Sequence, residues 1–119
     1  MSSVVPYLIR AYYGWIEDSK LTPHVLVNTE INGVLVPEGL AADGKIVLNI
    51  GSSATSGLLL TNKTISFKAR FSGRSEKISV PCSAVLSIYA KENGEGMFFD
   101  NQPGQSDKKE KKPNLTILD

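Results

Sequence analysis

The side chains best suited to catalysis in this chain are a single histidine and a single cysteine. His24 is the only histidine, so a histidine-based metal site or a Ser-His-Asp triad would have to be centred on it. It follows Thr22-Pro23 without an acidic residue close in sequence, which favours a structural role. Cys82 follows Pro81, and a lone cysteine in an apolar segment is more often a small buried hydrophobe than a nucleophile. Neither residue predicts catalysis.

The other motifs that could carry chemistry are incomplete. Residues 51–57 are rich in glycine and serine, but they lack the Gly-Lys-Ser/Thr ending that gives a phosphate-binding loop its positive charge. The carboxylates Asp18, Glu30, Glu38 and Asp43 are scattered, without the pairing that acid–base catalysis requires. We therefore expect no enzyme activity, no cofactor and no metal site.

Positively charged side chains gather on one predicted strand and its turn. Lys68 and Arg70 alternate with inward residues and so share a face, and Arg74 and Lys77 lie in or just after the following turn. Such a cluster can attract an acidic extended peptide or a single-stranded RNA, or it can be a solvated sheet face. The whole chain has a formal net charge of +1, which gives no general attraction to nucleic acid or to an anionic membrane.

Composition and the first residues predict a one-domain cytoplasmic protein. The chain has 119 residues, of which 41% are hydrophobic and 21% charged, as in globular domains. One cysteine cannot form an intramolecular disulfide and fits a reducing compartment. Residues 1–10 do not combine a basic start with a long apolar run, and no apolar stretch approaches the ~20 residues of a membrane-spanning helix.

The elements that must position these side chains begin with a helix from Pro6 to about Lys20. Proline is favoured at the first helical position, where its missing N–H costs nothing. We expect Ile9 and Tyr13 to lie off the apolar face of this helix. That face is broad and is expected to lie across a sheet, and its surplus apolar surface indicates a second contact such as a dimer interface. Its residues are Tyr7, Leu8, Ala11, Tyr12, Trp15 and Ile16.

Short strands separated by turns follow this helix. Asn32-Gly33 and Asp43-Gly44 are turn signals, and in the strand 64–71 the apolar side chains alternate with polar ones. Pro81 to about Lys91 is expected to be a short helix, and Asn93-Gly94 its end. The predicted strands cover residues 24–29, 34–36, 45–50, 58–60, 64–71, 76–80 and 97–99. This order predicts a mainly β fold with flanking helices, a small twisted β-barrel preceded by an N-terminal helix.

The composition changes sharply at Asp100. Residues 100–112 are polar and charged and have nothing to bury, so they are expected to form a disordered linker after a domain over residues 1–99. Apolar residues return in the segment 113–119. This segment reads as a short docking motif at the end of a tether, or as a C-terminal strand that folds back onto a sheet edge.

Several segments together resemble the stringent starvation protein B (SspB) family. They cover essentially all of residues 6–99 in order and at compatible spacing. The similar segments are Pro6–Trp15, Leu21–His24, Asp43–Ile50, Phe67–Gly73 and Ser79–Gly94, the last including the predicted helix and its ending. The resemblance implies an Sm-like twisted barrel that forms a homodimer through the N-terminal helix, with Tyr7, Leu8, Ala11, Tyr12 and Trp15 in the interface.

The resemblance also implies a function. Members of the family are adaptors that capture the degradation (ssrA) tag that tmRNA adds to stalled nascent chains and deliver it to the ClpXP protease. The implied tag groove has Leu48, Asn49, Ile50, Gly51 and Ser52 on one side and Lys68, Ala69, Arg70 and Phe71 on the other. The implied docking motif for the N-terminal domain of ClpX contains Pro113, Leu115, Ile117 and Leu118.

Two features depart from the family pattern. The chain ends in Asp119 where the pattern usually has a basic residue, and the linker is short. About a dozen residues give a root-mean-square reach of about 20 Å and an extended limit of roughly 40 Å. The alternative function is an RNA-binding Sm-like barrel that uses Lys68, Arg70, Arg74 and Lys77, but the near-neutral charge counts against it.

Overall fold

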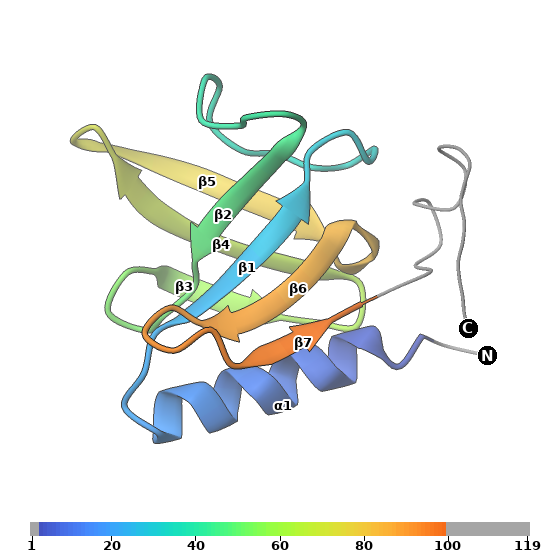
Figure 1. Ribbon diagram of the computed structural model, residues 1–119. Coiled ribbons are helices and arrows are strands. Elements are labelled where there is room, and N and C mark those ends of the chain that lie inside the picture. Colours follow the sequence, from blue (N-terminus) through green and yellow to red (C-terminus); the bar gives the residue numbers. More distant parts are fainter. Residues whose placement is uncertain (1–2, 100–119) are drawn as a thin grey trace.

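Two stacked antiparallel β-sheets and one α-helix make up residues 3–99, the part of the chain that the computed structural model describes (Figure 1). One sheet has the order β2-β1-β6-β7 and the other the order β3-β4-β5. A 3₁₀ turn at Cys82–Ala84 joins β5 to β6. The elements are α1 (Val5–Asp18), β1 (Pro23–Asn28), β2 (Lys45–Asn49), β3 (Ser56–Leu60), β4 (Thr64–Phe71), β5 (Arg74–Pro81), β6 (Val85–Ala90) and β7 (Gly96–Phe98).

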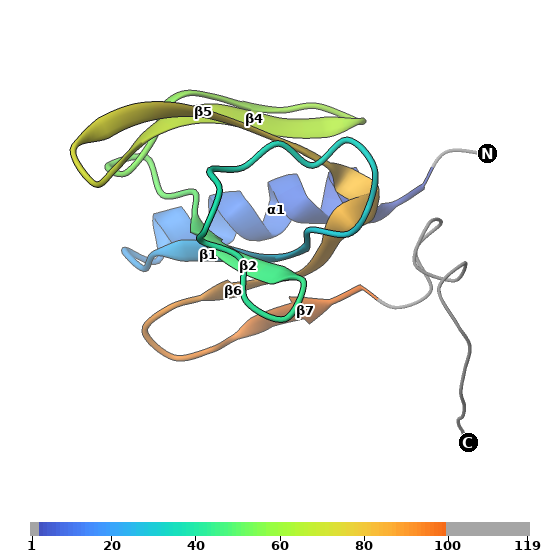
Figure 2. The ribbon, with the colours of Figure 1, turned by 90° about the horizontal axis from the view of Figure 1, so that it is seen from above.

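The mainly β architecture with an N-terminal helix is confirmed. Viewed from above, the sheets form two layers with α1 visible between them, so the helix lies across one open end of the stack (Figure 2). Within residues 3–99 the strands form two sheets and not one closed ladder. A single bridge, Leu35 with Ser79, attaches the loop after β1 to β5.

Alternating side chains on the facing strands fill the space between the sheets. Val25 and Val27 on β1 and Ile78 and Val80 on β5 are fully buried, while their chain neighbours point outward. Phe67 on β4 is 4% exposed and completes the layer. β-Branched residues are well suited to this arrangement because they pack on a pleated surface with few rotamers to lose. The inward positions predicted for the strand 64–71 are therefore confirmed.

The helix packs on the sheets through a face that only partly coincides with the predicted one. Leu8, Tyr12 and Ile16 of the predicted face contact the core, but Ile9 and Tyr13, which were expected to lie off that face, contact it too. Ile9 and Ile16 are both 1% exposed and anchor α1 in the core, whereas Tyr7 and Trp15 are about half exposed, at 51% and 49%. Ala11 is also exposed. The helix carries two apolar stripes, and periodicity cannot say which one faces the sheet. The compact isoleucines fill the gap above the strands, so the expectation that Ile9 lies off the core-facing side was wrong.

The predicted helix from Pro81 to Lys91 is also wrong. After the turn at Cys82–Ala84, the chain enters strand β6 between β1 and β7, with burial on both faces: Val85, Ser87, Ile88 and Ala90 are all buried. A strand covered on both faces lacks a regular apolar–polar alternation. Its apolar run cannot be distinguished from a buried helix by periodicity alone.

In the connection between β1 and β2, one predicted hairpin is wrong and one predicted turn is confirmed. The return strand predicted at 34–36 is absent, and residues 29–44 form a loop in which isolated bridges join Leu35 to Ser79 and Ala42 to Lys45. Asp43-Gly44 makes the predicted tight turn: both residues have positive φ (56° and 74°), and Ala42 and Lys45 exchange backbone hydrogen bonds across it. The remaining strand predictions are confirmed with shifts of one or two residues at their ends.

Candidate functional site

β2, an edge strand of the four-stranded sheet, passes β4 of the other sheet (Figure 1). Residues of both strands line a groove of about 380 Å³. Beyond the buried Phe67, the inner face of β4 continues with the half-buried Ala69 and Phe71. These two side chains extend past the edge at β2 and form one wall. The groove is lined by His24, Val47, Leu48, Asn49, Ala54, Phe67, Ala69, Arg70, Phe71 and Lys91.

The structure brings together part of the predicted site. Five of the nine predicted groove residues line this one cavity, from two strands that are distant in sequence: Leu48, Asn49, Ala69, Arg70 and Phe71. Lys68 is exposed on the same strand and lines two adjoining cavities, one of which shares Ala69 and Arg70 with the groove. Ala69 lies between larger neighbours, which leaves room for a peptide backbone.

The other three predicted residues hold the loop beside the groove and do not line it. Ile50 is fully buried, and its N–H donates to the carbonyl oxygen of Pro23 (3.0 Å). The N–H of Gly51 donates to Oδ1 of Asn49 (2.8 Å). Ser52 donates from its N–H and its Oγ to the Glu17 carboxylate, at 2.7 and 3.1 Å. These bonds fix the loop that places Ala54 in the groove wall.

His24 is a groove residue that sequence reasoning placed in a structural role. It pairs with Asn49 on β2 and with Tyr89 on β6, so the three side chains point to the same face of the sheet. The His24 and Tyr89 rings meet edge-on, with centroids 5.8 Å apart. The alternation of β1 shows that His24 points away from the core, but only the pairing with Asn49 shows what it faces. Val47, Ala54, Phe67 and Lys91 were also missed, because each reaches the groove through strand register or loop closure.

The groove is cationic at its rim and neutral at His24. Arg70 and Lys91 line it, and none of the described lining residues is a carboxylate. Burial lowers the pKa of His24 below its ordinary value of 6.5; Lys91 lowers this pKa further, and Glu92 partly opposes the shift. Such a lining suits an extended peptide with amide or carboxylate side chains, which Arg70 can meet by charge-assisted hydrogen bonds.

Glu92 is held away from the groove by Thr22. Its carboxylate accepts hydrogen bonds from the N–H and the Oγ1 of Thr22, at 2.8 and 2.7 Å, and these bonds lower the pKa of Glu92. The Lys91 N–H donates to the carbonyl oxygen of Thr22 (2.9 Å). The segment between α1 and β1 therefore fixes the end of β6 and with it the position of Lys91.

Cys82 has the surroundings of a core residue. It is 5% exposed, its Sγ donates to the carbonyl oxygen of Thr61 (3.6 Å), and burial raises the pKa of the thiol. A raised pKa disfavours the nucleophilic thiolate. Among residues 3–99 no group of three histidine, cysteine or acidic side chains is placed to hold a metal ion. Nor is any helix in this part of the chain long and apolar enough to cross a membrane.

The outward stripe of α1 is the second candidate surface. It consists of the exposed Tyr7, Ala11 and Trp15, and it is bordered by Leu8 and Tyr12, which are half-buried and pack against the core. These five residues are the ones predicted for a dimer interface, and the structure leaves the first three exposed. The predicted docking residues Pro113, Leu115, Ile117 and Leu118, and the linker before them, lie outside the described part of the chain.

Two known sequences or families resemble this chain. The family model described as "Stringent starvation protein B" matches residues 3–116. A similar curated protein, the "Stringent starvation protein B homolog" of Haemophilus influenzae, is 50% identical over 95 residues, or 80% of this chain. The match covers 63% of that relative, so this chain spans less than two thirds of its length.

Proposed function

This chain belongs to the stringent starvation protein B family, and on that premise we propose that it is a non-catalytic cytoplasmic adaptor for the ClpXP protease. Its cargo is a protein that carries the ssrA degradation tag, which tmRNA adds to stalled translation products. It binds the tag in the groove between β2 and β4 and presents the rest of the tag to ClpX. No bond in the cargo is broken by the adaptor itself.

The observation that carries this proposal is the lining of the groove. A peptide backbone can approach closely at Ala69 and Ala54, apolar contact is offered by Val47 and Phe71, and Arg70 supplies a charged donor at the rim. These groups come from both sheets, so an extended chain that lies in the groove contacts all of them at once. A shallow groove with a few placed polar groups gives specificity with modest affinity.

Delivery of the bound tag is proposed to depend on the C-terminal segment 113–119 and on self-association through α1. The segment 113–119 docks on the N-terminal domain of ClpX, and the polar residues 100–112 act as the tether. Tag and tail then bind the same enzyme through one linked molecule, which raises the local concentration of tag at the ClpX pore. Self-association through the outward stripe of α1 gives two grooves and two tails in one adaptor.

The direct test is the fluorescence anisotropy of a labelled tmRNA-tag peptide titrated with the full chain. We expect saturable binding of the tag peptide and none of a scrambled peptide with the same composition. The scrambled peptide controls for non-specific attraction to Lys68, Arg70 and Lys91. Equal binding of both peptides, or of neither, would remove the tag as the cargo.

The same titration with a labelled single-stranded RNA tests the alternative. Lys68, Arg70, Arg74 and Lys77 are exposed on β4 and β5 and could contact phosphates. Phosphate contacts make the affinity for RNA fall steeply as the salt concentration rises. Tight RNA binding with a steep salt dependence, in the absence of tag binding, would favour an RNA-binding function.

A further inference from the structure

The outer face of the three-stranded sheet carries positive charge without a carboxylate between the charges. Cross-strand partners point to the same face of a sheet, so the outward residues of β4 and β5 form one surface. These residues alternate with the buried Phe67 and Ile78 and are all cationic or hydroxyl-bearing: Ser66, Lys68, Arg70, Ser75, Lys77 and Ser79. Glu76, the acidic residue of β5, pairs with Ala69 and points to the other face.

Two lysines lie directly opposite each other on this surface. Lys68 on β4 is the cross-strand partner of Lys77 on β5, and both are exposed. Like charges in such a pair destabilise the strands that carry them. The described residues that line the cavity shared by the two lysines include no carboxylate that could offset the repulsion. An anion that binds between the lysines would offset it.

A cavity of about 330 Å³ lies beside this lysine pair. It adjoins a β-bulge, because the register between β3 and β4 shifts between Ser56 and Leu59, and Gly57 has a left-handed φ of 66°. A Cβ atom on Gly57 would meet nothing within 4 Å beyond its own chain neighbours, so the space above the bulge is open. The cavity is lined by Ser56, Gly57, Leu59, Ser66, Phe67, Lys68 and Lys77.

An adjoining cavity of about 300 Å³ continues the same chemistry. The two cavities share Ser56 and Lys68, and the second is also lined by the hydroxyl-bearing Ser53, Thr55 and Ser75 and by Arg70. Among the described residues that line it there is again no carboxylate. Ammonium and guanidinium groups together with hydroxyl groups are typical ligands of phosphate in proteins.

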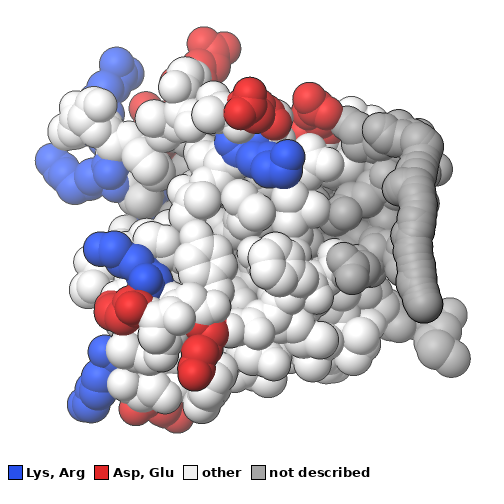
Figure 3. All heavy atoms as spheres, in the orientation of Figure 1, with Lys and Arg blue, Asp and Glu red and all other residues white. Residues whose placement is uncertain are grey.

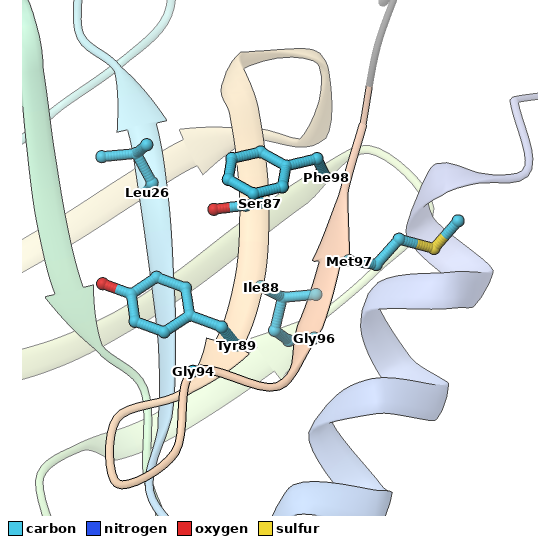
Figure 4. A pocket seen from close by; sticks show the side chains of 8 residues that line it. All are labelled: Leu26, Ser87, Ile88, Tyr89, Gly94, Gly96, Met97 and Phe98. Atoms are coloured by element: carbon cyan, nitrogen blue, oxygen red, sulfur yellow. The ribbon is translucent and has the colours of Figure 1, made fainter.

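The opposite face of the molecule has a different character. A cavity of about 290 Å³ on the outer face of the four-stranded sheet is lined by uncharged described residues, among them Leu26, Tyr89 and Phe98 (Figure 4). Figure 3 shows this face: basic and acidic side chains lie around its rim, and uncharged atoms cover β1 and β6. The strands β3, β4 and β5 contain four basic residues and one acidic residue, a net of +3 in a chain whose net charge is +1. Positive charge is therefore concentrated on the three-stranded sheet.

We propose that the lysine pair and the cavity beside it bind the phosphate group of a small organic phosphate. Two ammonium groups suit a phosphate monoester or a diphosphate, which carries about two negative charges at neutral pH. Ser56 and Ser66 supply hydroxyl donors for further phosphate oxygens, and Leu59, which is 59% exposed, offers apolar contact to the organic part. The site is distinct from the tag groove, whose lining contains neither lysine.

Titration of the full chain, followed by the NMR chemical shifts of its backbone amides, tests the proposal. The probes are inorganic pyrophosphate, ADP and adenosine. We expect the two phosphate compounds to bind and to shift the amides around Gly57 and Lys77, and adenosine not to bind. Lys77→Gln should weaken both phosphate compounds about tenfold or more, because a charge-assisted contact is lost. Lys45→Gln, which removes an exposed lysine from β2 on the other sheet, is the matched control and should bind as the wild type does.

Thermal unfolding separates lost binding from lost folding. Lys77→Gln removes the repulsion from Lys68, so without ligand the variant should unfold at a temperature no lower than the wild type. Pyrophosphate should raise the unfolding midpoint of the wild type more than that of the variant, because a ligand that binds only the folded state stabilises it. Equal increases in the two proteins would contradict the proposed role of Lys77.

Each remaining outcome also decides the proposal. Equal affinity of pyrophosphate for the wild type and Lys77→Gln overturns it, and so does the absence of binding to the wild type. A loss of tag affinity in Lys77→Gln assigns the lysine to the tag site and overturns it as well. Single-stranded RNA that binds far more tightly than pyrophosphate, and that also depends on Lys77, assigns this face to a nucleic acid instead. Tag binding by the wild-type chain is measured separately, so it stands or falls independently of these results.

Discussion

In the proposed function, Ala69 sets how closely the tag backbone approaches β4. It is half-buried in the groove wall, and the neighbouring Phe71 and Arg70 are much larger. A longer side chain here would occupy the groove and leave the inner core unchanged, because Ile65 and Phe67, further along the same face, hold the strand in place.

We expect Ala69→Gln to weaken tag binding at least about tenfold, a free-energy loss of about 1.4 kcal/mol, without unfolding the domain. The measurement is peptide anisotropy together with thermal unfolding. Ser66→Gln is the matched control, since Ser66 is on the same strand but lines a different cavity. An affinity that is unchanged in Ala69→Gln would show that the tag does not lie along this wall.

His24 makes the stability of the domain depend on pH. Burial and Lys91 lower its pKa in the folded protein, with Glu92 opposing. Between its ordinary pKa of 6.5 and the lower folded value, the unfolded chain binds a proton that the folded chain does not. The free energy of unfolding therefore falls as the pH drops through this window, and the loss stops below the folded pKa.

We expect the His24→Gln variant to lose less stability than the wild type between about pH 7.5 and about pH 5. Urea unfolding at several pH values measures this difference. The carboxylates titrate in both proteins, so the difference between the two pH profiles is the contribution of His24 to the free energy of unfolding. Parallel pH profiles for the two proteins would mean that the His24 pKa is the same in the folded and unfolded states.

At the scale of the elements, α1 has two apolar stripes with different tasks. The Ile9 and Ile16 stripe closes the core, while the stripe of Tyr7, Ala11 and Trp15 stays accessible. An edge-on contact between Tyr12 and Trp15, with centroids 5.7 Å apart, and the Arg10 guanidinium 4.8 Å from the Tyr7 ring order the outward aromatic residues. Side chains ordered in advance lose less entropy when a partner covers them.

We expect Ala11→Glu to abolish self-association while it changes the stability of the single chain by no more than about 0.5 kcal/mol. Ile9→Ala should do the reverse, lowering the free energy of unfolding by about 2–5 kcal/mol through a cavity in the core. Sedimentation velocity and urea unfolding measure the two effects. Ala41→Glu, in the loop before β2, is the control for the added charge. A dimer that survives Ala11→Glu would place the interface elsewhere.

For the whole molecule, the proposed function assigns capture and delivery to separate segments. The groove belongs to residues 3–99, whereas the apolar segment 113–119 follows a polar stretch. A tether of about a dozen residues reaches about 20 Å on average, so it can raise the local concentration of cargo only if ClpX binds both parts within that distance.

We expect deletion of Pro113–Asp119 to leave the tag affinity unchanged and to abolish the adaptor's acceleration of ClpXP degradation. Degradation of a tagged fluorescent protein, with and without adaptor, measures this. Thr116→Ser, a small polar change within the same segment, should keep full activity. Equal degradation rates with the intact and the deleted chain would rule out delivery by tethering.

The sequence by itself determined the local features. Asp43-Gly44 predicts its tight turn because few residue pairs accept two positive φ angles, and the alternation in residues 64–71 predicts which side chains enter the core. The resemblance to the family located Asn49, Ala69, Arg70 and Phe71, which the structure places in one groove. In each case the signal lies within one short segment.

Only the tertiary structure decided which of two plausible faces or elements is used. Val85–Ala90 is a strand because β1 and β7 form hydrogen bonds with its two edges. Ile9 rather than Tyr7 faces the core because the space between the helix and the sheets fits the smaller side chain. His24 belongs to the groove because the register pairs it with Asn49. These outcomes depend on contacts between segments far apart in the chain, and a local pattern contains no information about the partner that will cover it.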